Sequence, residues 1–195
     1  MKTLIVTAHP RSDSLTAAVA QSFASILIQN GHSVEHADLV AERFDPVLRS
    51  EDEPIWSEKE RIVATPDVLN EMKRVERNEA TVMIYPVWWW SLPAILKGWI
   101  DRVWTQHWAY GARKYPHRRV WMLRVAGVGE HYYSTGNYDA MMRLMLETGL
   151  LKYCDIAQPR FELLFDSLKG PAEAAAVVTK AQSIAKEFWS GPGLD

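Results

Sequence analysis

Residues 86–104 read PVWWWSLPAILKGWIDRVW and carry the most informative pattern in this chain. An apolar strand is expected to end at Tyr85, three adjacent tryptophans then form a turn, and a helix follows. In open α/β sheets, ligands bind in the crevice outside the carboxyl ends of the strands. The tryptophans therefore favour a wall for a flat ligand over aromatic core packing. Three adjacent side chains cannot all point the same way, so at least one of them is expected to pack in the core.

The helix after the tryptophans is strongly amphipathic. Its apolar side chains recur at positions i, i+3, i+4, i+7, i+8 and i+11, which is a full stripe along one face. They are Leu92, Ile95, Leu96, Trp99, Ile100 and Val103. Ser91 is placed to cap this helix, and Pro93 is tolerated in its first turn.

Strands and helices alternate along the rest of the chain. Short apolar runs predict strands at residues 3–8, 33–38, 81–85, 120–126 and 156–165. Helical spacing predicts helices from Leu15 to a stop at Gly31, and at residues 67–77, 92–103, 138–148 and 171–189. Gly149 is expected to end the fourth helix. Residues 39–61 are polar and contain two prolines, which indicates an irregular excursion, open to use as a partner-facing flap.

This order of elements predicts the fold class. Five strands alternating with helices are typical of an α/β fold. With five strands and 195 residues, we expect a flavodoxin-like, doubly wound, five-stranded parallel sheet of order 2-1-3-4-5, in a single domain covering residues 1–195. In that order the first and third strands meet at the switch point, so the loop after the first strand should face the tryptophans.

Composition limits the function classes. The chain is 48% hydrophobic with a formal net charge of −2, so nothing draws it toward nucleic acid or an anionic membrane. No window reaches the roughly 18 apolar residues of a membrane span, and the N-terminal apolar run is too short for a signal peptide. The single cysteine, Cys154, excludes an intramolecular disulfide, and the scattered histidines predict no metal site. We expect a cytoplasmic protein without a nucleic-acid partner.

The loop after the first strand, residues 9–16, is a candidate anion site. A hydroxyl-rich turn at a helix N-terminus offers free backbone N–H groups and the positive end of the helix dipole. The alternative is that Ser12 or Ser14 only caps the helix. The loop lacks both GxGxxG and GxxxxGK[ST], so neither a dinucleotide Rossmann site nor a P-loop is expected.

Two other segments have a structural and a functional interpretation. Gly127 and Gly129 follow the fourth strand and allow close approach to a ligand, although a simple turn is the better explanation of the glycines alone. Arg124 is unusual within a strand and could reach a loop carboxylate or the pocket. The basic loop at residues 113–119 is usually a solvated surface, and the alternative is a clamp for cofactor phosphates.

Together these residues resemble the NAD(P)H:quinone oxidoreductases of the DT-diaphorase type, a flavodoxin-fold family that includes ancillary oxidoreductases of bacterial potassium-efflux systems. The likeness covers nearly the whole chain. It is carried by Ala8-His9-Pro10, by Ser14-Leu15-Thr16 and by the run from Pro86 to Val103. It implies a tightly bound flavin, FAD with FMN as the alternative, and NAD(P)H as co-substrate. It also implies a homodimer with the active site at the subunit interface.

The resemblance assigns roles to individual residues. The flavin's phosphate and ribityl chain would be held by His9, Ser14, Leu15 and Thr16. The ring would be held by Pro86, Val87, Trp88, Trp89 and Trp90, with Trp89 and Trp90 against it and Trp88 as the member that packs. Val125, Ala126, Gly127 and Tyr132 would close its other edge.

The chain departs from the family pattern at two places. The family's Thr-Thr-Gly-Gly turn reads Arg124-Val125-Ala126-Gly127 here, so the hydroxyl donors are gone and the contacts would come from the backbone. The tyrosine–histidine pair that assists hydride transfer corresponds to Tyr132 and Tyr138, so that a tyrosine stands at the histidine's place. Tyr132 and Tyr138 are the candidate catalytic residues.

The function implied by the resemblance is flavin-dependent NAD(P)H oxidation, with two-electron, ping-pong hydride transfer to a quinone or a similar flat electrophile. The altered relay slightly favours an alternative, a flavin-loaded regulatory subunit of a membrane transporter with weak or secondary activity. A third reading, a one-electron flavodoxin, would be expected to be more acidic than this chain.

Overall fold

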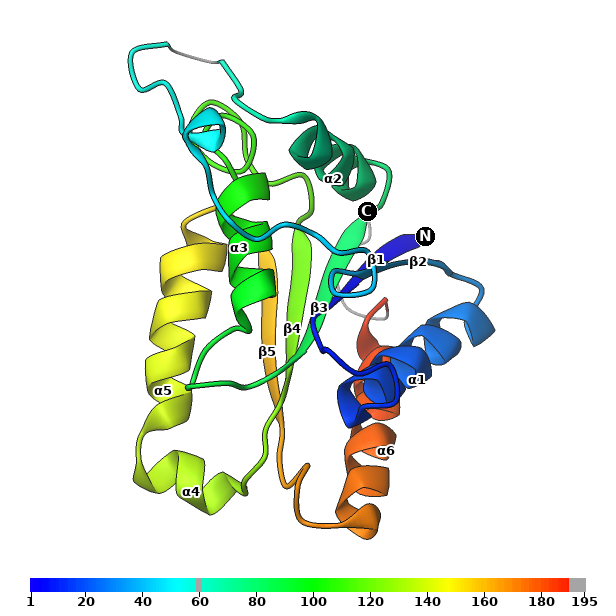
Figure 1. The fold of residues 1–195 in the computed structure, drawn as a ribbon. Helices are drawn as coiled ribbons and strands as arrows, with labels where there is room; N and C mark the ends of the chain where they lie inside the picture. Colours follow the sequence, from blue (N-terminus) through cyan, green and yellow to red (C-terminus); the bar gives the residue numbers. More distant parts are fainter. Residues whose placement is uncertain (59–60, 190–195) are drawn as a thin grey trace.

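The computed structural model describes residues 1–58 and 61–189. Its centre is a five-stranded parallel sheet of order β2-β1-β3-β4-β5 (Figure 1), which confirms the predicted topology. Each strand lies within two residues of its predicted position. The strands are β1 (Lys2–Thr7), β2 (Ser33–Asp38), β3 (Ala80–Pro86), β4 (Arg119–Val125) and β5 (Gln158–Leu164).

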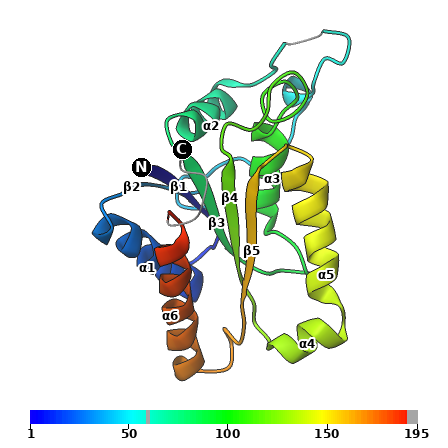
Figure 2. The same ribbon diagram turned by 180° about the vertical axis from the view of Figure 1, so that it is seen from behind.

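Helices cover both faces of this sheet. One layer consists of α1 (Leu15–Gln29) and α6 (Pro171–Glu187), and the other contains α3 (Ala94–Val103) and α5 (Tyr138–Arg143), as Figures 1 and 2 show from opposite sides. The remaining helices are α2 (Pro66–Glu76) and α4 (Glu130–Thr135). The arrangement is therefore doubly wound.

The two layers follow from burial of the central strands on both faces. β3 and β4 are buried along their whole length, which is typical of the near-continuous apolar strands of parallel sheets. Because side chains alternate along a strand, Val82 and Ile84 pack with α1 and α6, whereas Met83 and Tyr85 pack with α3. Cys154 lies in the core on the α3 side, and burial raises the pKa of its thiol to about 11.

Three local expectations were wrong. The helix expected to stop at Gly149 continues as a π-helical segment, Leu144–Lys152, because Gly149 does not adopt the left-handed conformation that ends a helix. The short helix α4 was not predicted. Ser91 does not cap α3, which begins at Ala94 after Pro93, because the Ser91 backbone is paired with Trp88.

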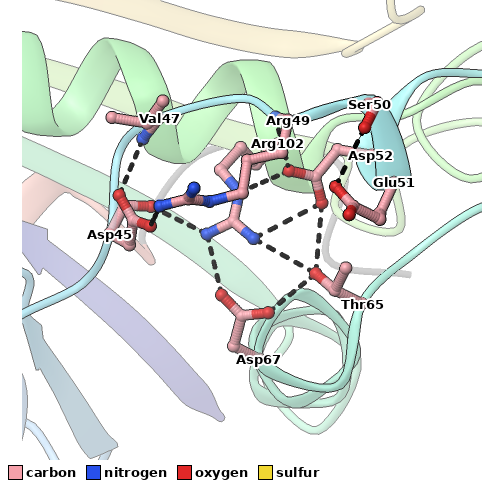
Figure 3. Close-up of polar contacts among 9 residues, drawn as sticks. All are labelled: Asp45, Val47, Arg49, Ser50, Glu51, Asp52, Thr65, Asp67 and Arg102. Carbon is pink, nitrogen blue, oxygen red and sulfur yellow. Dashed lines mark hydrogen bonds and ion pairs between the residues drawn. The ribbon is translucent and has the colours of Figure 1, made fainter.

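The irregular excursion is anchored to α3 by a buried arginine. Arg102 donates from Nε to Asp52 Oδ2 at 2.8 Å, and from Nη1 to Asp67 Oδ2 and the Asp45 carbonyl, both at 2.7 Å. Thr65 donates to Asp52 and accepts from Arg102 (Figure 3). One guanidinium thus ties the excursion, at Asp45 and Asp52, to the first turn of α2 at Asp67. Its expected role as a partner-facing flap stays a prediction, and residues 59–60 lie outside the described residues.

A glycine lets the excursion lie directly against α3. A Cβ built on Gly98 would lie 2.1 Å from the Pro46 carbonyl oxygen, whereas one on Gly149 would meet nothing closer than 3.7 Å. Alanine normally stabilises a helix by up to about 1 kcal/mol relative to glycine, but overpacking costs ~1–3 kcal/mol. We therefore expect Gly98→Ala to lower the free energy of unfolding in urea by roughly 2 kcal/mol. The control Gly149→Ala should leave it unchanged or raise it; equal effects of both variants would contradict the close contact.

Candidate functional site

Three adjoining cavities open at the carboxyl ends of β1, β3 and β4, at the switch point of the sheet. The loop cavity, about 220 Å³, lies between the β1–α1 loop and the start of the tryptophan run. The ring cavity, about 250 Å³, shares Val87 and Gly127 with it. A third cavity of about 170 Å³ adjoins the loop cavity at His9 and Thr16 and reaches His36 at the end of β2.

The loop cavity has the chemistry of an anion site. Its walls include His9, Ser14, Leu15 and Thr16, all four of the residues expected there. The first N–H groups of a helix have no partner within the helix. The Ser14 hydroxyl accepts from Ala17 N–H at 3.1 Å, so it caps α1 without using the N–H groups of Leu15 and Thr16. Capping and anion binding are therefore compatible in this loop.

The tryptophan run forms a strained two-residue turn. Trp88 and Ser91 exchange backbone hydrogen bonds of 3.3 and 3.0 Å, while Trp89 and Trp90 between them have φ values of 50° and 57°. Two left-handed central residues define a type I′ turn, which usually contains Asn-Gly. The left-handed conformation costs about 1–2 kcal/mol for each residue with a side chain. Such strain persists only where the surrounding structure holds it, and it concentrates at functional sites.

The three tryptophans differ in environment. Trp89 is 95% exposed at the rim of the ring cavity, and Trp90 forms part of the cavity wall. The prediction that Trp88 packs is wrong: it is 44% exposed and lines the loop cavity, with its ring 6.1 Å from that of His9. Trp90 is the packed member, because the left-handed turn directs it toward α4 and α5.

A set of tyrosines holds Trp90. Tyr138 stacks on it with ring centroids 3.7 Å apart and an interplanar angle of 1°, and Tyr133 meets it edge-on at 5.3 Å. Tyr132 lies 5.8 Å away at 15° and is 53% exposed. Burial raises the pKa of Tyr133 to about 12, so this hydroxyl is protonated at neutral pH. The two candidate catalytic tyrosines line neither the loop cavity nor the ring cavity: Tyr132 and Tyr138 pack against Trp90, and the tyrosine in the wall of the ring cavity is Tyr133.

The loop after β4 supplies the remaining wall. Gly127 lines both cavities, whereas Val125, expected at the edge of the ring, lines the loop cavity and not the ring cavity. Ala126 lines neither: it is fully buried, and its N–H donates to the Leu164 carbonyl at 2.8 Å, so it is not free to contact a ligand. Leu168 was missed, because backbone bonds across the sheet rather than any local pattern bring the loop after β5 to the loop cavity.

Arg124 and the basic loop have structural partners. Arg124 is fully buried and forms an ion pair with Asp139, so that it reaches a carboxylate rather than a cavity. Arg119 is also buried and donates to the Phe188 carbonyl, and Lys114 pairs with Asp155. The basic loop leads into the amino end of β4, opposite the cavities, so it forms no phosphate clamp within the described chain.

Two further features bear on function in residues 1–58 and 61–189. In this part of the chain no helix is long and apolar enough to cross a membrane. The same residues contain no group of three or more histidine, cysteine, aspartate or glutamate side chains that could hold a metal ion.

Comparison with known proteins places this geometry in a family. Residues 1–188 match the model of the family described as flavodoxin-like fold. The chain belongs to this family. An Escherichia coli relative named as an uncharacterized NAD(P)H oxidoreductase is 37% identical over 134 residues, which is 68% of each protein. Rat NAD(P)H dehydrogenase [quinone] 1 is 27% identical over 200 residues, covering 91% of this chain and 73% of the rat protein.

Solved structures agree with the family match. An NAD(P)H:quinone oxidoreductase from Methanothermobacter marburgensis superposes with a TM-score of 0.87 at 28% identity, over 96% of both chains. A Treponema denticola general stress protein in complex with FMN, 22% identical with a TM-score of 0.62 over 97% of both chains, shares the fold alone. The resemblance inferred from the sequence motifs is confirmed.

The strain in the tryptophan turn can be measured. Trp89 contributes little packing because its side chain is almost fully exposed. We expect Trp89→Gly to raise the free energy of unfolding by about 1 kcal/mol in urea denaturation, because glycine adopts the left-handed conformation without cost. Trp56 is also exposed but has no left-handed backbone, so Trp56→Gly should be neutral or destabilising. A loss of stability in Trp89→Gly would show that the turn is not strained.

Proposed function

We propose that this chain is a flavin-dependent NAD(P)H oxidoreductase that passes two electrons to a quinone or a similar flat acceptor. The observation that carries the proposal is the junction between a helix N-terminus suited to a phosphate and a cavity walled by tryptophans. The relatives named as NAD(P)H oxidoreductases and quinone dehydrogenases support the same activity.

The residues present fit a flavin. Leu15 and Thr16 offer backbone N–H groups and a hydroxyl to a phosphate in the loop cavity. Val87, Trp89 and Trp90 offer an apolar wall to a planar ring in the next cavity. Gly127 lines both cavities, and a Cβ there would lie 2.9 Å from the side chain of Leu168, which lines the loop cavity.

The residues of the chain would bind the flavin, orient it toward its substrates and shield its ring from water. When bound, the flavin supplies the redox chemistry, because its ring accepts a hydride from NAD(P)H and returns two electrons to an acceptor. The tryptophan wall would hold a flat molecule in position and exclude water from it. The exposed Tyr132 hydroxyl could donate a hydrogen bond to an acceptor oxygen, and Tyr138 would act by keeping Trp90 in place.

The length of the groove bears on which flavin the chain would bind. The FMN complex among the fold neighbours supports FMN, which the loop and ring cavities would accommodate. The third cavity, bordered by Gln21, His36 and Asp38, offers room beyond the first phosphate and supports FAD. The mass of the cofactor released by heating distinguishes the two.

An exposed apolar face supports the homodimer. Met141, Leu144 and Met145 lie on one side of the α5 region with large exposed areas, and Tyr153 is exposed after the π-helical segment. Patches of this kind commonly mark interfaces between proteins. We propose that a second copy of the chain covers this face, and sedimentation velocity tests it: a monomer at all concentrations would contradict it.

The function is tested by cofactor and turnover together. We expect the purified protein to bind FAD or FMN and to bleach on anaerobic titration with NADPH. Gly127→Val should raise the flavin Kd at least tenfold, or ~1.4 kcal/mol, because its side chain fills the junction between the cavities, while Gly149→Ala should bind as the wild type does. A protein that takes up neither flavin would contradict the proposal. Tight flavin binding with negligible turnover would favour the regulatory-subunit alternative.

A further inference from the structure

One charged side chain of the sheet is buried completely. Arg124, near the carboxyl end of β4, is fully buried, and its guanidinium lies 5.2 Å from the centre of the Phe161 ring. Its Nη2 lies 3.0 Å from Asp139 Oδ1 in an ion pair. None of its three guanidinium nitrogens has a hydrogen-bond partner among the described residues, so the two groups are held together by their charges. The guanidinium is therefore held mainly by one carboxylate and one aromatic face.

That carboxylate belongs to the segment that supports the ring cavity. Asp139 directly follows Tyr138, whose ring is stacked on Trp90. Gly136 allows this packing, because a Cβ there would lie 2.1 Å from the Tyr138 ring. Asp139 is also bound by Arg143 at 2.9 Å, and Arg143 donates to the Phe161 carbonyl at 3.1 Å.

The segment has little stability of its own. The helix α4 has six residues, and α5 has six before it passes into the π-helical segment; neither has a side-chain hydrogen bond at its N-cap. A six-residue helix is marginal in water and the π-helix is a rare conformation, so this segment depends on tertiary contacts. The contact between Arg124 and Asp139 joins this segment to the carboxyl end of β4, a strand that is buried along its whole length. Removal of Asp139 would leave the buried charge of Arg124 without its counter-charge.

We propose that Arg124 is a positioning residue, which fixes the α4–α5 segment through Asp139 so that Tyr138 and Trp90 form a rigid wall of the ring cavity. This inference rests on the proposed function for its effect on flavin binding, but not for its effect on the segment itself. Arg124 acts through Asp139 and Tyr138 and does not line the cavities.

The test compares two buried or partly buried arginines on opposite faces of the sheet. Arg124→Met keeps most of the side-chain volume and leaves Asp139 paired with Arg143. The control is Arg160→Met, because Arg160 also pairs with carboxylates and lies over an aromatic ring, that of Trp121, on the α6 side. In Arg124→Met we expect amide hydrogen exchange in residues 130–143 of the flavin-free protein to accelerate about tenfold. Arg160→Met should leave it at the wild-type rate.

Flavin affinity gives the second measurement. We expect Arg124→Met to raise the flavin Kd about tenfold, or ~1.4 kcal/mol, at a temperature where circular dichroism shows the variant to be fully folded. Arg124→Lys, which retains a charge for Asp139, should recover part of the affinity.

A double-mutant cycle tests the pair directly. Asp139→Asn leaves Arg124 buried without its counter-charge. We therefore expect the thermal midpoint of Asp139→Asn to fall by roughly 10 °C from that of the wild type, which is a larger fall than in Arg124→Met. Arg124→Met in the Asp139→Asn background should restore part of this loss. Additive effects would overturn the proposed pairing.

The remaining outcomes are also decisive. Unchanged exchange in residues 130–143 of Arg124→Met would overturn the positioning role, as would an equal change in Arg160→Met. If the wild-type protein binds no flavin, the proposed function fails, and the exchange measurement still decides whether Arg124 holds the segment.

Discussion

Burial of β1, β3 and β4 on both faces is the constraint on which the rest of this structure depends. Strands of this kind need a helical layer on each side, and parallel strands need a crossover between them. Those crossovers leave in opposite directions from β1 and β3, so that the loops after the two strands diverge and open a crevice. The cavities therefore lie where the chain topology leaves the sheet uncovered, and the tryptophan run lies there because it directly follows β3.

The site combines a strained turn, at Trp89 and Trp90, with a support formed by β4 and the α4–α5 segment. Trp89 and Trp90 adopt a conformation that glycine would adopt more readily, and the stack on Tyr138 holds one of them in place. Tyr138 is the first residue of α5, and the residue after it, Asp139, forms an ion pair with Arg124 of β4. The ion pair between Arg124 and Asp139 thus connects β4 to the stacked rings of Tyr138 and Trp90 in the wall of the ring cavity. Natural sites commonly contain local conflicts of this kind, compensated by the structure around them.

The sequence predicted the features that depend on periodicity. The strands follow from short apolar runs, the sheet order from the number of strands and their alternation with helices, and the amphipathic stripe from Leu92 to Val103 from a period of 3.6 residues. Most residues expected at the crevice lie there. Features that depend on distant contacts were not predictable. Nothing near Trp88 indicates that it stays exposed while Trp90 packs, because α4 and α5 determine this. Ala126 follows β4 directly, but its N–H donates to the Leu164 carbonyl of β5 and is not free to contact a ligand. The π-helical course past Gly149 likewise has no local signal.

The position of the lone cysteine has a practical consequence. Alkylating reagents react with the thiolate, and in the folded protein the Cys154 thiol is both enclosed by the core and held protonated at neutral pH by its raised pKa. Its neighbours Leu151 and Ile156 belong to the π-helical segment and to the turn before β5. The rate at which the thiol is labelled therefore reports how often this part of the core opens. The natural sequence therefore provides one built-in probe of local unfolding, which thiol labelling can read.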